Sequence, residues 1–215
     1  EWEEAYRTVL SEIKRIQEQY GRNAFAMLSG VSLSTEKSYL VGKFARVALK
    51  TANLDYNGRL CMVSAGAGNK KAFGMDRSSN SWADLAHAEV IIITGANISE
   101  CFPVLTYRIW EARDNGAKII VIDPRVIPLA RTADVHLPLR SGTDTALMST
   151  MLKVLIDNDW LDHDFIDNYT SGWEETAKTV EHCTLEWGEE ITGVPKELIY
   201  KAAEMWGKAK TSFLV

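Results

Sequence analysis

Several features that mark whole classes of protein are missing from this sequence. Its three cysteines, Cys61, Cys101 and Cys183, are scattered and odd in number. They therefore predict neither a disulfide framework nor a Cys-x-x-Cys metal site. The four histidines form no His-Glu-x-x-His or His-x-x-x-His pair, and no serine lies in a Gly-x-Ser-x-Gly motif. The sequence thus gives no support to hydrolytic zinc or triad chemistry.

Basic clusters and long apolar runs are also absent. The formal net charge is -5 and no run of Lys and Arg occurs. Because duplex binding needs a basic surface that displaces counterions, we expect no nucleic-acid partner. No apolar run approaches the length of a bilayer and no basic-then-apolar leader opens the chain, so we expect no membrane span. What is present, 46% apolar and 25% charged residues over 215 positions, is typical of a folded α/β protein.

Two apolar runs organise the chain. Val90-Ile-Ile-Ile-Thr-Gly-Ala-Asn97 and Lys118-Ile-Ile-Val-Ile-Asp-Pro-Arg125 are β-branched, and each ends at a polar turn. Such runs predict strands covered on both faces. The segment between them predicts a helix through Leu105, Ile109 and Ala112 that ends at Asn115-Gly116. The pattern is a βαβ unit, whose ligands collect where strands end and helices begin.

Further elements extend this pattern in both directions. The spacing predicts helices over residues 2–20, from Ser34 to about Lys50, and through Leu147 to Leu155, and short strands over residues 24–28 and 131–139. Residues 53–60 predict turns, and residues 158–192 predict an irregular segment. A last helix follows Pro195. We therefore expect a doubly wound, mostly parallel α/β sheet with helices on both faces, similar to dinucleotide-binding domains.

The two ends suggest a fragment of a longer polypeptide. The chain opens on Glu1-Trp-Glu-Glu-Ala-Tyr without Met, in a pattern that is already helical. It closes on Thr211-Ser-Phe-Leu-Val215, which predicts a strand that is just beginning. We expect further parts of the protein outside this sequence.

Small and polar residues after the first strand predict a phosphate-binding turn. Gly95, Ala96 and Asn97 would let an anion approach backbone N–H groups at a helix N-terminus, although the full Gly-x-Gly-x-x-Gly spacing is absent. Glu100 would repel a phosphate and is better suited to accept a hydrogen bond from a hydroxyl or amino group. The alternative is that Asn97 and Ser99 only cap the next helix.

Two other turns offer similar groups. Asp123 and Arg125, with Pro124 between them, could accept hydrogen bonds from a ribose or base and pair with a phosphate. The alternative is that Asp123 and Arg125 only end the strand and pair with one another. The loop Ser141-Gly142-Thr143-Asp144 is either a helix cap or a purine-binding loop, and taken alone it indicates a cap.

Cys61 is the most specific candidate for metal chemistry. It lies between Arg59 and a glycine-rich run, a setting that favours a thiolate, and thiolates suit transition metals. Met62 could belong to a core or line the same pocket. The glycines at 66 and 68 weaken a helix there, so we expect another group to approach that backbone closely. An unpaired cysteine is more often a small buried apolar residue.

Five motifs, taken in order, resemble one family. They are Arg59-Leu-Cys-Met-Val-Ser-Ala-Gly-Ala-Gly68, Gly95-Ala-Asn-Ile-Ser-Glu-Cys-Phe-Pro103, Ile122-Asp-Pro-Arg125, Thr132-Ala-Asp-Val-His-Leu137 and Ser141-Gly-Thr-Asp-Thr-Ala-Leu147. Together with Trp2-Glu-Glu-Ala5 they resemble the molybdopterin oxidoreductases of the dimethyl sulfoxide reductase superfamily. The likeness covers nearly the whole chain.

This resemblance implies a cofactor and a site. The cofactor would be bis-molybdopterin guanine dinucleotide carrying molybdenum or tungsten, with Cys61 as the metal ligand and Met62 beside the substrate. The turn from Gly95 to Glu100, residues 123–125 and residues 142–144 would bind one dinucleotide. Residues 1–59 would be part of an α/β domain, and residues 60–215 a molybdopterin guanine dinucleotide-binding domain, both truncated from a larger catalytic subunit.

The sequence also departs from the family pattern. Phe102 stands where the family usually has histidine before proline. The family's N-terminal iron–sulfur motif and the C-terminal domain that completes the cofactor site are absent from these residues. We therefore expect the iron–sulfur cluster to lie in a missing N-terminal part, and the isolated fragment to be inactive.

The Arg-Leu-Cys-Met context resembles nitrate reductases, particularly assimilatory ones. It implies oxygen-atom transfer from nitrate at molybdenum, an electron-transfer partner protein and a cytoplasmic location. The alternatives are a formate dehydrogenase-like enzyme, although formate dehydrogenases usually have histidine at the position of Met62, and a non-catalytic guanine-nucleotide-binding domain. A pyridine-nucleotide dehydrogenase fits less well, because the glycine spacing is wrong.

Overall fold

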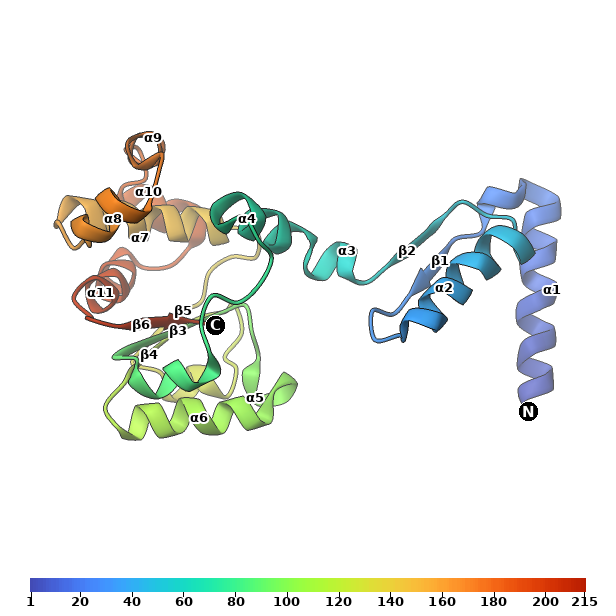
Figure 1. Ribbon diagram of the computed structural model, residues 1–215, viewed down its shortest axis with the longest axis horizontal. Coiled ribbons are helices and arrows are strands. Elements are labelled where there is room, and N and C mark those ends of the chain that lie inside the picture. Colours follow the sequence, from blue (N-terminus) through green and yellow to red (C-terminus); the bar gives the residue numbers. More distant parts are fainter. The chain divides into compact units, whose positions relative to one another are not determined.

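The computed structural model describes residues 1–215 as two compact units, Glu1–Ser79 and Asn80–Val215 (Figure 1). Each unit contains its own parallel sheet. The boundary falls after Ser79, whereas the sequence analysis divided the chain after residue 59. No helix combines the length and the apolar character that a bilayer span requires.

The first unit is built on a short parallel pair of strands. β1 (Met27–Ser29) pairs with β2 (Leu54–Tyr56), with Met27 opposite Leu54. The sequence analysis assigned only turns to residues 53–60, and this was wrong for β2. A three-residue strand has no alternation long enough to detect, and its partner is far away in the sequence.

Helices make up most of the rest of this unit. They are α1 (Trp2–Tyr20), the short η1 (Arg22–Ala24), α2 (Thr35–Lys43) with its π-helical extension η2 (Phe44–Ala48), α3 (Gly58–Cys61) and α4 (Val63–Phe73). Helix α1 has the predicted bounds and ends at Gly21, whose φ of 90° favours glycine. The Ser34 side chain accepts a hydrogen bond from the Lys37 N–H and so caps α2.

The second unit contains a four-stranded parallel sheet in the order β5-β4-β3-β6. The strands are β3 (Val90–Thr94), β4 (Lys118–Ile122), β5 (Val135–Leu137) and β6 (Ser212–Leu214). Strands β3 and β4 begin at Val90 and Lys118, where the two predicted apolar runs begin, and end before the polar turns of those runs. The expectation of a mostly parallel sheet is confirmed, and every strand pairing in the sheet is parallel.

Helices cover both faces of this sheet, so the predicted doubly wound α/β fold is confirmed (Figure 1). On one face lie η3 (Trp82–His87), α5 (Ile98–Cys101), α6 (Pro103–Asp114) and η4 (Leu129–Thr132). On the other lie α7 (Asp144–Asp157) and α11 (Lys196–Gly207). The alternation of each strand separates two cores, because neighbouring side chains point to opposite faces.

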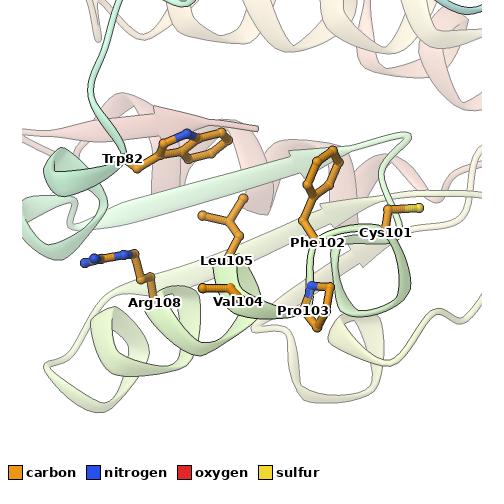
Figure 2. A pocket seen from close by; sticks show the side chains of 7 residues that line it. All are labelled: Trp82, Cys101, Phe102, Pro103, Val104, Leu105 and Arg108. Atoms are coloured by element: carbon orange, nitrogen blue, oxygen red, sulfur yellow. The ribbon is translucent and has the colours of Figure 1, made fainter. Parts of the chain in front are cut away.

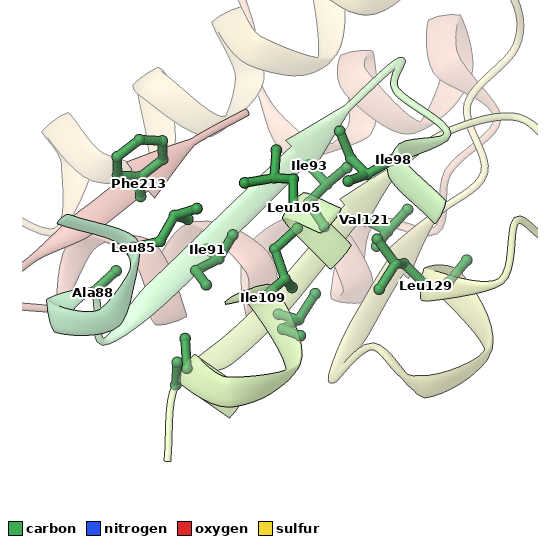
Figure 3. Packing of buried hydrophobic residues seen from close by; sticks show 14 of the residues in the cluster. Leu85, Ala88, Ile91, Ile93, Ile98, Leu105, Ile109, Val121, Leu129 and Phe213 are labelled. Carbon is green, nitrogen blue, oxygen red and sulfur yellow. The ribbon is translucent and has the colours of Figure 1, made fainter. Parts of the chain in front are cut away.

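Figure 3 shows the core on the α6 side, where Ile91 and Ile93 of β3 contact Leu105 and Ile109 of α6. Val90 and Ile92 point to the opposite core, with Leu147 and Met151 of α7. The four β3 residues from Val90 to Ile93 are all buried, as expected for a strand covered on both faces.

Residues 158–192 correct another expectation. They contain three short helices, α8 (His163–Tyr169), α9 (Trp173–Thr179) and α10 (Leu185–Thr192), rather than an irregular segment. Asp162 caps α8 and Thr184 caps α10 through their side-chain oxygens. The caps were visible in the sequence, but helices of seven or eight residues show too few turns for a clear apolar stripe.

Candidate cofactor-binding site

The turns after β3, β4 and β5 lie at one edge of the sheet of the second unit. Thr94 is paired with Ile122, and Ile122 with Leu137, so the carboxyl ends of the strands are level. The Gly95 N–H donates to the Ile122 carbonyl at 2.9 Å. Strands β4 and β5 lie on one side of β3, and β6 lies on the other. This reversal of strand order is where open α/β sheets bind ligands.

The turn after β3 contains polar atoms that have no partner. Gly95 has a φ of 61°, and an added Cβ would meet nothing within 4 Å. Asn97 is the N-cap residue of α5, but its side chain makes no capping hydrogen bond. Asn97 Oδ1 and Ser99 Oγ are both buried and unpaired. The alternative that these side chains only cap the helix is therefore wrong.

Buried polar atoms are normally hydrogen-bonded, because leaving one unpaired costs about 1–3 kcal/mol. Two such atoms in one turn fit a ligand that offers hydrogen-bonding groups. Glu100, the other polar residue predicted in this turn, is exposed. Ala96 is partly buried and packs against the core on the α6 side.

The turn after β4 is held together internally. Asp123 is 2% exposed, and its Oδ1 accepts a hydrogen bond of 2.8 Å from the Arg125 N–H. The guanidinium Nε of Arg125 lies 3.5 Å from the same oxygen. The two residues thus do pair with one another. The side chain of Arg125 is nevertheless 68% exposed, and Pro124 is exposed, so Arg125 is the group of this turn that a ligand can reach.

The loop after β5 lies beside a pocket of about 520 Å³. Gly142 has a φ of 85°, and the Thr143 hydroxyl donates to the Arg140 carbonyl at 2.6 Å. Thr143 is the N-cap residue of α7, but its side chain makes no capping hydrogen bond. Asp144, the first residue of α7, is exposed. Gly142 and Thr143 both line the pocket.

This pocket also contains residues that the sequence analysis did not select. Cys183 Sγ lies 3.7 Å from Nε2 of His182, whose ring meets that of Trp187 edge-on at 5.3 Å. Burial raises the pKa of the Cys183 thiol. All three residues follow α9, in the segment predicted to be irregular. No motif in the sequence indicated that this segment would reach the Gly142 loop.

Cys61 and Met62 belong to the first unit. Cys61 is the last residue of α3 and is exposed, as a metal ligand must be before it binds. Arg59 pairs with Asp55 at 2.9 Å, which lowers the pKa of the Asp55 carboxyl. The charge of Arg59 is thus shared with this carboxylate rather than available to Cys61 alone.

The glycine-rich helix α4 supports the expected close approach at one position. A Cβ on Gly66 would lie 2.7 Å from Oδ2 of Asp76 and 3.5 Å from Cε of Met62. A Cβ on Gly68 would meet nothing within 4 Å. Met62 is 41% exposed and serves as the N-cap residue of α4. Gly66 therefore allows Met62 and the Asp76 carboxylate to lie against the helix.

A second pocket, of about 560 Å³, is lined by none of the predicted site residues (Figure 2). Leu105 lies between the rings of Trp82 and Phe102, with Arg108 and Cys101 toward the two ends. Phe102 stands where histidine was expected, and it makes this pocket apolar at that position. We assign no cofactor contact to it.

No group of three or more His, Cys, Asp or Glu side chains among residues 1–215 could hold a metal ion. Cys61 can contribute only one ligand. A metal at this cysteine would need its other ligands from elsewhere, which fits a metal carried by an organic cofactor.

Together, the all-parallel sheet, its reversed strand order and the unpaired polar atoms at its carboxyl edge are typical of the open α/β proteins that bind ligands at this edge. Comparison with known proteins narrows this class. The molybdopterin oxidoreductase family model matches residues 1–209, and the chain belongs to that family.

Individual relatives give similar levels of identity. The chain is 39% identical over 214 residues to the assimilatory nitrate reductase catalytic subunit of Bacillus subtilis (strain 168), covering 99% of this chain and 30% of the relative. It is 36% identical over 214 residues to the F420-dependent formate dehydrogenase subunit alpha of Methanocaldococcus jannaschii, covering 100% of this chain and 31% of the relative.

Among solved structures, acetylene hydratase from Pelobacter acetylenicus matches with a TM-score of 0.68 and 28% identity, covering 99% of this chain and 29% of that chain. The chain thus spans about 30% of the length of the relatives that it matches. Membership of the family implies a pterin cofactor with molybdenum or tungsten. In the second unit the unpaired Asn97 and Ser99 atoms fit such a group. In the first unit the exposed thiol of Cys61 also fits it.

Proposed function

We propose that this chain is the central cofactor-binding part of a molybdenum oxidoreductase that reduces nitrate to nitrite. When bound, bis-molybdopterin guanine dinucleotide supplies the redox and oxygen-atom-transfer chemistry. The chain's own residues bind and orient it. The observation that carries the proposal is the pair of buried, unpaired polar atoms at the carboxyl edge of the sheet, in a chain of this family.

Each predicted residue has a role in this proposal. Cys61 holds the metal through its thiolate, and Met62 forms an apolar wall beside the substrate. Gly95 and Ala96 leave room for a ligand, while Asn97, Ser99 and Glu100 offer hydrogen bonds to it. The identity of Cys61 and its exposure support the first of these roles.

The guanine dinucleotide contacts the other two turns. Arg125 supplies an accessible positive charge for a phosphate, and Asp123 with Pro124 fixes the turn that presents it. Gly142, Thr143 and Asp144 bind the base end. The pocket beside Gly142 and Thr143 supports this role, because its volume of about 520 Å³ lies in the range of small-molecule sites.

Nitrate is preferred over formate on two grounds. Met62 follows Cys61, where formate dehydrogenases usually have histidine. The relative named as a nitrate reductase is 39% identical and the one named as a formate dehydrogenase 36%. These values are close, so formate dehydrogenase stays the alternative substrate assignment.

Substrate turnover by the complete polypeptide tests the choice. With reduced methyl viologen as the electron donor, the purified polypeptide should form nitrite from nitrate. Cys61→Ala should abolish both this activity and metal binding. Formate-dependent dye reduction without nitrite formation would instead establish the alternative.

We propose a cytoplasmic location and an electron-transfer partner protein from the same resemblance to assimilatory enzymes. The iron–sulfur cluster that passes electrons to the metal would lie outside these residues.

A non-catalytic guanine-nucleotide-binding domain is the rival from another class, favoured by the accessible Arg125 and the Gly142 pocket alone. It predicts GDP binding that is unchanged by Cys61→Ala, and no molybdenum or tungsten in the complete protein. Elemental analysis of the complete protein separates the two, since the oxidoreductase must contain one of these metals.

A further inference from the structure

His136 is a polar residue of the Thr132–Leu137 motif, and the proposed function gives it no role. It lies in the middle of β5, between the buried residues Val135 and Leu137. Because side chains alternate along a strand, its ring points to the opposite face of the sheet from theirs. There its Nε2 lies 2.8 Å from the backbone carbonyl oxygen of Asp123.

The backbone of β5 offers no donor for this carbonyl. Leu137 is the last residue of β5, Pro138 has no N–H, and the Leu139 N–H donates to the Leu137 carbonyl at 3.0 Å. Asp123 is the first residue beyond β4. The His136 ring therefore takes the place of a backbone donor at the point where the ladder between β4 and β5 ends.

The contact also defines the form of the ring. A carbonyl oxygen can only accept a hydrogen bond, so Nε2 must carry the proton. The Asp123 carboxylate, on the other side of the same residue, accepts the Arg125 N–H at 2.8 Å. Asp123 is thus held at its carbonyl by β5 and holds Arg125 with its side chain.

We infer that His136 is a positioning residue: its Nε2–H fixes the turn of Asp123, Pro124 and Arg125 in the shape that presents Arg125 to the dinucleotide. The role of the turn rests on the proposed function. The hydrogen bond that shapes the turn does not, so the two can be tested separately.

The test compares two substitutions in the 215-residue chain. His136→Leu removes the donor and keeps an apolar side chain, whereas His136→Gln keeps an N–H at the end of a side chain of similar reach. Val135→Ala is the matched control, because it weakens β5 packing without removing the Asp123 contact. Circular dichroism checks that each variant is folded, and His136→Ala replaces the leucine variant if that one is not.

Two quantities are measured for each folded variant. Hydrogen exchange of the Arg125 amide reports on the turn, and calorimetric titration with GDP reports on the nucleotide site. We expect His136→Leu to speed Arg125 exchange by about fivefold to tenfold, as loss of one hydrogen bond predicts, and to weaken GDP binding by about tenfold. His136→Gln should restore both the Arg125 exchange rate and the GDP affinity. Val135→Ala should not change the Arg125 exchange rate more than that of other amides, and it should not weaken GDP binding.

Unchanged Arg125 exchange in His136→Leu overturns the inference, and so do equal effects of the leucine and glutamine variants, which would show that ring packing is what matters. Faster exchange that glutamine rescues, in a wild-type chain that binds no GDP, supports the role of His136 in the turn. That result would instead count against the nucleotide role in the proposed function.

Discussion

The Arg125 backbone N–H and the Asp123 carboxylate form a hydrogen bond of 2.8 Å that closes the turn after β4. Asp123 is buried at 2% exposure, and a buried carboxylate must be paired. The nearby guanidinium of Arg125, with Nε 3.5 Å from the same oxygen, provides the opposite charge. Asp123, which the sequence predicted to contact a ribose or base, thus stabilises its own turn.

Substitutions of Asp123 should separate the hydrogen bond from the charge. Asp123→Asn keeps an oxygen that can accept from the Arg125 N–H, so we expect a small loss of stability. Asp123→Ala leaves that N–H without its partner and should lower the free energy of unfolding by about 1–3 kcal/mol. Urea denaturation followed by circular dichroism measures both. Equal losses for the two variants would show that charge, and not the acceptor, holds the turn.

The glycines of α4 should respond in opposite directions. Gly66→Ala places a Cβ 2.7 Å from Asp76 Oδ2, so the carboxylate must move, and we expect a loss of about 1 kcal/mol. Gly68→Ala meets nothing within 4 Å and should raise stability by about 0.5–1 kcal/mol, because alanine is the better helix former. Thermal unfolding of both variants gives the comparison. Stabilisation by both would show that Asp76 yields without cost.

Much of the second unit could be predicted because its elements carry strong local signals. The runs of β-branched residues in β3 and β4 have no helical period, and Pro103 and Asn115-Gly116 mark the two ends of α6. The register of β3 against β4 then brings the Gly95 and Asp123 turns to one edge, as expected for parallel strands. Two of the five motifs that resemble the molybdopterin oxidoreductase family contain these turns.

Other features depend on contacts that a sequence does not display. The pairing of β1 with β2 joins two strands of three residues each. The pocket beside Gly142 is completed by Cys183 and Trp187, from a segment whose short helices lacked a clear period. The sequence predicted pairing of Asp123 with Arg125 only as an alternative, and no motif indicated the contact between His136 and Asp123.

Asp134 should make the free energy of unfolding depend on pH. Burial of its carboxylate opposes ionisation, but the hydrogen bond from the Ile119 N–H at 2.9 Å and the Lys118 ammonium at 3.0 Å outweigh this and lower the pKa of Asp134. A lowered pKa in the folded state means that the group stabilises the fold above its unfolded pKa of about 3.9. That contribution is lost as the pH falls through the folded value.

We therefore expect Asp134→Asn to be less stable than the wild type at pH 7, and the difference to shrink below about pH 4. Urea denaturation between pH 3 and pH 7 measures it. Asp114→Asn is the control, since its exposed pair with Arg113 should contribute under about 1 kcal/mol. A difference between Asp134→Asn and the wild type that stays constant with pH would contradict the ion-pair explanation.

The unpaired hydroxyls of Ser99 and Thr106 provide the sharpest test of the site. Both oxygens are buried without a partner, but Ser99 lies in the turn region after β3, and Thr106 lies within α6 among the core residues of that face. Removing a buried group that has no partner should leave stability unchanged or raise it by up to about 1 kcal/mol. We expect this of both Ser99→Ala and Thr106→Val in thermal unfolding of the free chain.

Ligand binding should distinguish Ser99→Ala from Thr106→Val. If the Ser99 hydroxyl forms its hydrogen bond with the ligand, Ser99→Ala should weaken GDP binding by about fivefold to tenfold, the effect of one hydrogen bond. Thr106→Val should leave GDP binding unchanged. Such a stabilising substitution that costs affinity is the signature of a binding group, since a residue needed only for packing would lose stability. Equal GDP affinity of the two variants and the wild type would remove Ser99 from the site and leave Asn97 as the only unpaired group in the turn.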